Sequence, residues 1–201
     1  ARSQPSLEAQ LCNLADEIAY NAHDIDDGVR SGLITLEQLQ DVALFDDFRR
    51  ETLAEFPHLQ EQAQGRRLLY EAIRRMLSSQ VYAVIAATQS ALDAAAPRSA
   101  DEARQLPRML QFGEAMQDKS QVLKKFLFVQ LYRHPKVREL FALYLSRPQE
   151  MQGRFLARLQ ATRAEVDEAS AAARVVADYI AGMTDRFAAR EHERLTGLKL
   201  L

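Results

Sequence analysis

Residues 7–28 read LEAQLCNLADEIAYNAHDIDDG, and this stretch decides the fold class. Its apolar residues recur at helical spacing along one face: Leu7, Leu11, Leu14, Ile18, Ala22 and Ile25. Ser6 is placed to cap the first turn, and Gly28 is expected to end the helix. The stretch therefore predicts an amphipathic helix over residues 7–27 that buries one side.

The rest of the chain continues in the same way, because glycine and proline are scarce and helical periods dominate. A capping-box pair, Thr35 and Gln38, opens the next helix. Further helices are predicted over residues 45–56, 65–94, 114–134, 137–146, 151–160 and 164–195, with a polar connection over residues 95–107. The sequence therefore predicts an all-α protein.

The composition of the chain argues against several classes of protein. The net charge of −2 argues against a general nucleic-acid binder. Cys12 is the only cysteine, which excludes a disulfide within the chain and a Cys-based zinc site, and fits a reducing, cytoplasmic compartment. No apolar run approaches the roughly 18 residues that cross a membrane. The absence of an initiator methionine suggests a piece of a longer protein.

A polar stripe lies opposite the apolar face of the first helix. Asp16, Tyr20 and Asp24 follow one another at four-residue spacing, a ladder of about 12 Å. Two carboxylates and a phenol suit a ligand with a cation at one end and hydroxyls at the other. The alternative is the solvated side of an amphipathic helix, although stacked acids repel one another without a positive group between them.

The second candidate segment is residues 122–132, which are apolar almost all round and predict a buried helix. Lys124 and Lys125 lie within it, and a buried ammonium needs a partner or a bound anion. Lys124, Phe128 and Tyr132 share one face at helical spacing. The alternative is that both lysines extend to solvent while Phe128 belongs to the core.

These segments resemble the HD-domain deoxynucleoside-triphosphate triphosphohydrolases, the bacterial dGTPase-like family. The resemblance is carried by NLADEIAY at residues 13–20, HDIDDG at 23–28, LKKFLF at 123–128, LYRH at 131–134 and ADYIAGMTDRF at 177–187. It implies that Asp16 binds the metal, that Tyr20 packs against the deoxyribose and that Asp24 bonds the 3′-hydroxyl. His23, although it precedes an Asp, is not regarded as a metal ligand because no His lies upstream of it.

The resemblance also implies that Lys124 holds the triphosphate and that Tyr132 lies beside the sugar and base. Arg133 is a candidate contact to the base or a phosphate. Arg186 is a candidate phosphate contact, with an ion pair within the chain as the alternative. Phe128 replaces a histidine of the distant mammalian relative, which leaves base preference open, with dGTP the first candidate. Gly182 is expected to permit a close helix contact.

The implied fold is an HD-type phosphohydrolase, with the C-terminal part of the metal and nucleotide core over residues 1–60 and the HD-associated helical region over residues 61–201. The implied reaction converts a dNTP to a deoxynucleoside and triphosphate with Mg²⁺ or Mn²⁺. Of the four family ligands only Asp16 is present, and the others are expected N-terminal to Ala1. Since one carboxylate holds a metal weakly, the chain alone is expected to be inactive.

The family also implies a homo-oligomer. Two other function classes stay open. One is a non-catalytic nucleotide-binding or oligomerisation module, which would bind a dNTP without turnover. The other is a structural helical interaction domain, on which a nucleotide would have no effect.

Overall fold

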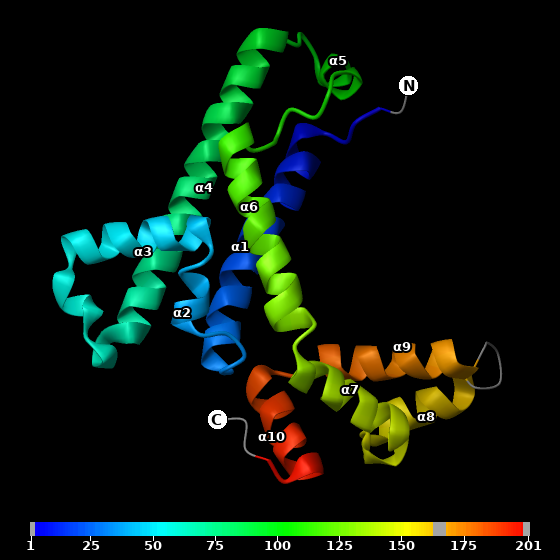
Figure 1. The fold of residues 1–201 in the computed structure, drawn as a ribbon. Coiled ribbons are helices and arrows are strands. Elements are labelled where there is room, and N and C mark those ends of the chain that lie inside the picture. Colours follow the sequence, from blue (N-terminus) through cyan, green and yellow to red (C-terminus); the bar gives the residue numbers. More distant parts are fainter. Residues whose placement is uncertain (1–2, 163–167, 199–201) are drawn as a thin grey trace. The chain divides into compact units, whose positions relative to one another are not determined.

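The computed structural model describes residues 3–162 and 168–198, and every regular element in these ranges is a helix (Figure 1). The all-α prediction is confirmed. The chain divides into two compact units: unit 1 comprises Ala1–Val29 and Ile34–Phe128, and unit 2 comprises Arg30–Leu33 and Val129–Leu201. The boundary predicted at residue 60 separates two regions of the family and not two compact units, so the division by compactness does not test it. It stays a prediction. None of the helices in the described ranges combines the length and apolarity needed to cross a membrane.

Unit 1 opens with α1 (Leu7–Arg30), which begins directly after Ser6. The backbone N–H of Ala9 donates to Ser6 Oγ at 3.3 Å, so the predicted cap is confirmed. The buried side includes Leu14, Ile18, Ala22 and Ile25, as expected. Leu11 lies on the surface instead, so this member of the predicted apolar face is wrong.

Gly28 does not end α1, which continues to Arg30. The left-handed position that follows the helix is taken by Gly32, with a φ of 68°. Gly28 is buried, and a Cβ there would lie 2.6 Å from Cδ1 of Ile34. The backbone N–H of Ile34 donates to the Gly28 carbonyl at 3.0 Å. The glycine therefore makes room for the chain to fold back, rather than terminating the helix.

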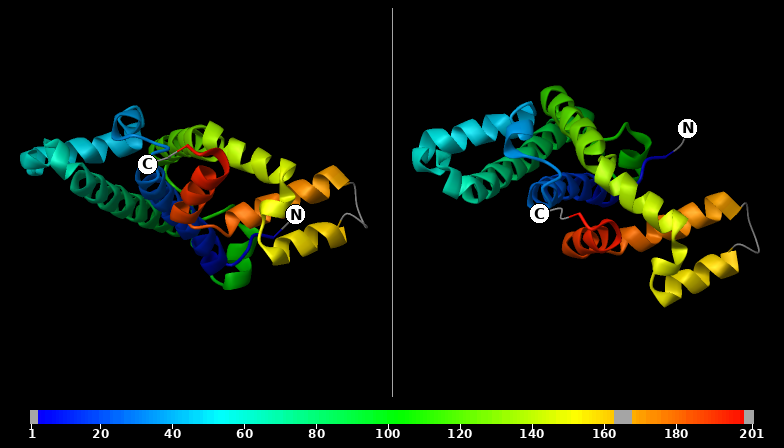
Figure 2. Two further views of the ribbon diagram at one scale, coloured as in Figure 1. Left: turned by 90° about the horizontal axis from the view of Figure 1, so that it is seen from below. Right: turned by 60° about the horizontal axis from the view of Figure 1, so that its bottom comes forward.

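The predicted capping box is confirmed at α2 (Leu36–Leu39), where Thr35 and Gln38 exchange backbone-to-side-chain hydrogen bonds at 2.9 and 3.2 Å. After α3 (Ala43–Glu55), Pro57 begins the 3₁₀ turns η1 (Pro57–Gln60) and η2 (Gln62–Gln64). The chain then returns in α4 (Gly65–Ala95), which runs beside α3 (Figure 2).

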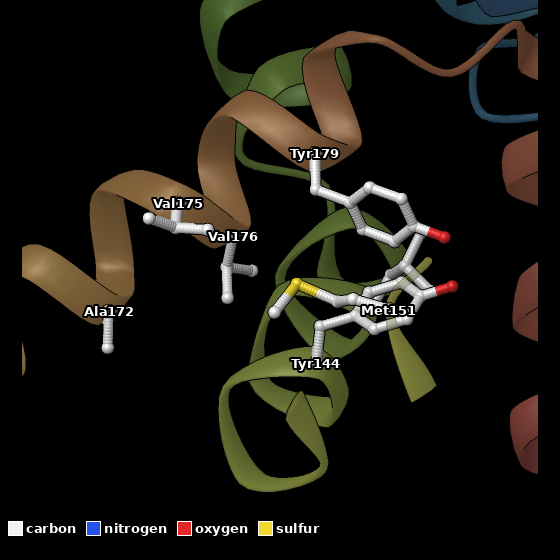
Figure 3. Packing of buried hydrophobic residues seen from close by; sticks show 7 residues of the cluster. Tyr144, Met151, Ala172, Val175, Val176 and Tyr179 are labelled. Atoms are coloured by element: carbon white, nitrogen blue, oxygen red, sulfur yellow. The ribbon is translucent and has the colours of Figure 1, made fainter. Parts of the chain in front are cut away.

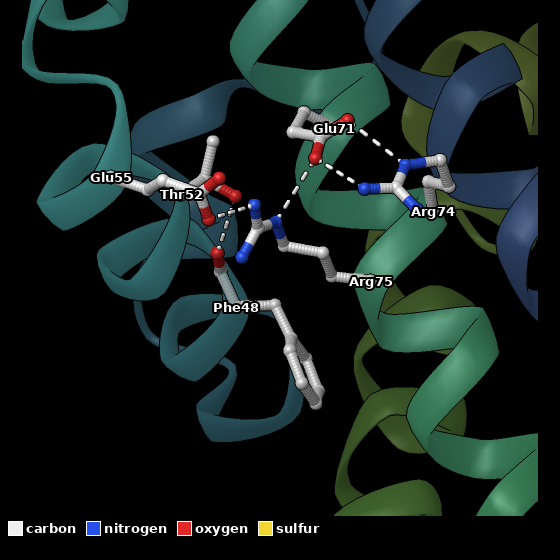
Figure 4. Close-up of polar contacts among 6 residues, drawn as sticks. All are labelled: Phe48, Thr52, Glu55, Glu71, Arg74 and Arg75. Carbon is white, nitrogen blue, oxygen red and sulfur yellow. Dashed lines mark hydrogen bonds and ion pairs between the residues drawn. The ribbon is translucent and has the colours of Figure 1, made fainter.

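An ion pair between Arg75 and Glu55 connects α4 to α3. The Arg75 guanidinium on α4 bonds Glu55 of α3 at 2.6 Å and Glu71 at 3.0 Å (Figure 4). Arg74, the residue directly before Arg75, binds the same Glu71 carboxylate. Since this pairing is at the surface, we attribute most of the α3–α4 stability to buried apolar side chains such as Phe45 and Leu69.

Within the polar connection predicted over residues 95–107, a short helix forms, α5 (Ala100–Gln105). Ser99 caps this helix by accepting the N–H of Glu102 at 3.1 Å. The chain continues into α6 (Glu114–Leu127). Leu14 and Ile18 of α1, Val84 of α4 and Phe112 form a buried core, and Met116 of α6 packs against it.

The helix predicted over residues 114–134 is α-helical only to Leu127 and continues as a π-helix, η3 (Phe128–Tyr132). Its predicted burial is also wrong. Leu123 and Leu127 are buried, whereas Val122 and Phe128 are about half exposed. One face of α6 packs on neighbouring helices, and its other apolar residues stay on the surface.

Unit 2 contains α7 (Pro135–Ser146), η4 (Pro148–Glu150), α8 (Gly153–Thr162), α9 (Glu168–Ala181) and α10 (Asp185–Thr196). Its core centres on Tyr144, whose ring meets Tyr179 edge-on with centroids 5.0 Å apart (Figure 3). The other buried members of this cluster are Leu140, Met151, Ala172, Val175 and Val176.

The long final helix predicted over residues 164–195 is wrong, because α9 ends at Ala181 and α10 begins at Asp185. Thr184 caps α10 by accepting the N–H of Phe187 at 3.3 Å. Among the described residues, a Cβ at Gly182 would meet two backbone oxygens of the preceding helix, those of Asp178 and Tyr179, at 3.6 Å, so the expected close contact with another helix is not found there and Gly182 lies at the break. The predicted start at Ala164 lies outside the described residues.

Candidate functional site

The predicted polar ladder lies on α1. Because α1 is α-helical throughout, Asp16, Tyr20 and Asp24 lie on one side of it, away from the buried Leu14 and Ile18. Asp16 is exposed, Tyr20 is 67% exposed and Asp24 is partly exposed. These side chains are therefore presented at the surface of unit 1, where a ligand can reach them.

Lys124 projects from α6 toward α1. Its Nζ lies 2.5 Å from Oε1 of Glu17, the residue next to Asp16. Both side chains are partly exposed, so the pair contributes no more than about 1 kcal/mol to stability. The contact places a cation beside the carboxylates of α1. It also shows that the Lys124 ammonium is partly exposed, whereas the sequence pattern predicted that it would be buried.

Glu17 is the polar residue that sequence reasoning left without a role. It follows Asp16 directly and has no periodic relation to the ladder, so helical spacing gave no reason to select it. Its ion pair with Lys124 forms because α6 lies beside α1. The Lys124 ammonium has three N–H donors and is partly exposed, so it can bind a second anion or exchange Glu17 for one at little cost.

Tyr132 and Arg133 belong to unit 2, and both are exposed. Tyr132 is the last residue of the π-helical segment. The predicted common face of Lys124, Phe128 and Tyr132 assumed α-helical spacing, which does not hold between residues 128 and 132 because a π-helix pairs residues five apart. Arg186 lies in the first turn of α10, and its side chain lies outside what the structure describes.

His134 has a structural role as the N-cap of α7. Its Nδ1 accepts the backbone N–H of Lys136 at 3.2 Å, which requires an unprotonated nitrogen. Burial lowers the pKa of His134, and the nearby Lys136 ammonium lowers it further.

This cap predicts a pH effect on stability. The unfolded histidine gains a proton near its ordinary pKa of 6.5, while the folded one resists protonation until lower pH. Protonation therefore favours the unfolded chain, and stability is lost as the pH falls below 6.5. His134→Asn keeps a capping side chain but cannot titrate. Thermal unfolding at about pH 7.5 and 5.5 should show a larger acid-induced loss for the wild type. Equal losses in both proteins would contradict the role of His134.

The described residues do not make a complete metal site. Among them, no three His, Cys, Asp or Glu side chains gather closely enough to hold an ion together. Asp16 can offer carboxylate oxygens, but hard divalent cations take six or more ligands in total. Asp16 by itself therefore does not make a metal site, and the described residues around the ladder do not complete one.

Comparison with known proteins places this geometry in context. Residues 110–194 match the family described as phosphohydrolase-associated domain. The chain is 46% identical over 209 residues to a deoxyguanosinetriphosphate triphosphohydrolase-like protein of Ralstonia nicotianae, covering 98% of this chain and 51% of the relative. Proteins of the same name from Bordetella pertussis and Nitrosomonas europaea are 44% and 37% identical, with 96% and 94% of this chain and 50% of each relative covered. The chain thus spans about half the length of the curated relatives it matches.

Proposed function

The chain belongs to the dGTPase-like HD family, and from this premise we propose that it supplies one part of the metal and nucleotide site of a dNTP triphosphohydrolase. The proposed reaction hydrolyses a dNTP, with dGTP the first candidate, to a deoxynucleoside and inorganic triphosphate. We propose Mg²⁺ or Mn²⁺ as the metal and a homo-oligomeric, cytoplasmic protein. The 201-residue chain by itself is proposed to be inactive, because it carries one metal ligand.

Each ladder residue has a proposed role in this reaction. Asp16 is one ligand of the metal, Tyr20 packs against the deoxyribose, and Asp24 accepts a hydrogen bond from the 3′-hydroxyl. Lys124 neutralises the triphosphate, since an ammonium is a strong partner for phosphate oxygens. Further nucleotide contacts are proposed for Tyr132, Arg133 and Arg186.

The main support for the proposal is that the side chain of Lys124 on α6 reaches α1. Its Nζ lies 2.5 Å from the carboxylate of Glu17, one residue from the proposed metal ligand. A triphosphate bound between a metal at Asp16 and the ammonium of Lys124 would have its charge neutralised from both sides. Without this approach, the ladder and the lysine would be two unrelated surface features.

The test is triphosphate release from dGTP with Mn²⁺ by the intact protein, at the full length of its relatives. Lys124→Ala should raise KM about 10- to 100-fold, because a charged hydrogen bond to phosphate contributes about 1.5–3 kcal/mol. Lys125→Ala is the matched control, since this neighbouring lysine is exposed and lies about 100° further around the helix. A KM that responds equally to both changes would contradict the assignment.

The same preparation separates the other function classes. Stabilisation by dGTP without release of triphosphate from the intact protein would favour a non-catalytic binding module. A melting temperature that dGTP does not change would favour a structural interaction domain. Release of triphosphate by the 201-residue chain alone would contradict the proposal that it is inactive.

A further inference from the structure

The outer face of α4 exposes a line of large apolar side chains. We define this outer face by Tyr70, Leu77, Val81 and Ile85, which are 42%, 36%, 40% and 57% exposed. Spacings of seven, four and four residues place all of them within about 80° of the helix circumference. The line is about 22 Å long at 1.5 Å per residue. The opposite side of α4 is already buried in unit 1 through residues such as Leu68, Ala72 and Met76.

The sequence of α4 is unusual for a helix with a solvated side. Residues 76–92 contain no charged side chain, and Tyr82 within this stretch is also exposed. Exposed helix faces ordinarily carry charged residues. Depletion of charge together with exposed tyrosine is typical of the centre of a protein interface. The outer face therefore has the composition of a covered surface.

We infer that the outer face of α4 packs against the part of the same polypeptide that corresponds to the half of its relatives outside this match. The relatives are about twice as long as the matched region, which leaves a comparable length of chain to fold against it. This inference rests on the fold and on the length of the relatives, and does not depend on the proposed reaction.

The area of the outer face favours this occupant over a second copy. The four side chains of the outer face are each roughly half exposed, so even at the roughly 150–250 Å² of an aromatic side chain they expose no more than about 450 Å² together. A stable complex between separate chains buries about 800 Å² on each partner. A segment of the same polypeptide needs less area, because its connection to the chain keeps it at high effective concentration.

The experiment compares thiol labelling of the intact protein with that of the 201-residue chain. Cys12 is exposed and is the only cysteine, so Cys12→Ser provides a background without thiols. Val81→Cys places a probe on the outer face. Ala86→Cys is the matched control, because Ala86 is exposed on the same helix about 140° further around it. Maleimide labelling of Val81→Cys should be at least about tenfold slower in the intact protein than in the chain, while Ala86→Cys changes less.

Two results would overturn the inference. Equal labelling rates at position 81 in both proteins would show that the remaining polypeptide does not cover the outer face. Protection in the intact protein that disappears on dilution, with light scattering reporting dissociation to monomers, would assign the outer face to a second copy. Cysteine is close in size to valine, and circular dichroism of each variant confirms that it is folded before labelling.

Discussion

Tyr144→Ala is expected to lower the free energy of unfolding of unit 2 by about 3–5 kcal/mol, the range for truncation of a fully buried aromatic side chain. Tyr144 is 0% exposed, and its ring packs edge-on against Tyr179. Its hydroxyl donates to Glu191 at 2.5 Å, which links α7 to α10. Alanine leaves a cavity at the centre of the cluster and removes this link. Urea unfolding of the 201-residue chain, followed by circular dichroism, measures the loss.

Two further variants separate the contribution of the Tyr144 ring from that of its hydrogen bond to Glu191. Tyr144→Phe keeps the ring and removes only the hydrogen bond to a charged acceptor, so it should cost about 1.5–3 kcal/mol, less than alanine. Tyr82→Ala, at a largely exposed position, should change stability by no more than about 0.5 kcal/mol. If alanine at position 144 costs no more than phenylalanine, the ring does not hold the core as described.

Local signals in the sequence predicted the elements of the fold well. The Ser6 cap, the Thr35–Gln38 capping box and the start of α4 at Gly65 each depend on neighbouring residues, and each is confirmed. The errors arise where distant residues decide the outcome. Gly28 looks like a helix stop until Ile34 folds back on it, and the break after Ala181 shows only weakly in a continuous helical pattern.

In the candidate site too, local patterns were predictable from the sequence and contacts between distant residues were not. Helical periodicity was sufficient to place Asp16, Tyr20 and Asp24 on one side of α1, because a single helix fixes their relation. The Glu17–Lys124 contact could not be predicted, since the two residues are far apart in the sequence and meet only through the packing of α6 beside α1. Hydrophobic pattern also overstated the burial of residues 122–132, because exposed apolar residues look the same in sequence as buried ones.

The largest effect on activity is expected from Asp16→Asn in the intact protein. Asparagine has almost the same shape as aspartate but removes the anionic charge from the proposed metal ligand. Loss of a residue that only supports a ligand costs about 10- to 100-fold, so loss of a ligand itself should lower kcat for dGTP hydrolysis by at least about 100-fold. The Mn²⁺ concentration that gives half-maximal activity should rise as well, which a purely structural role would not produce.

Stability should be unaffected, because the Asp16 side chain is exposed, and substitutions of this kind change stability by no more than about 0.5 kcal/mol. Asp118→Asn is the matched control: it makes the same chemical change at an exposed position of α6 and should leave kcat and the Mn²⁺ requirement as they are. If Asp16→Asn and Asp118→Asn behave alike, Asp16 does not bind the metal. The ladder on α1 would then be the solvated side of an amphipathic helix, and the interpretation of Lys124 as a triphosphate contact would lose its main support.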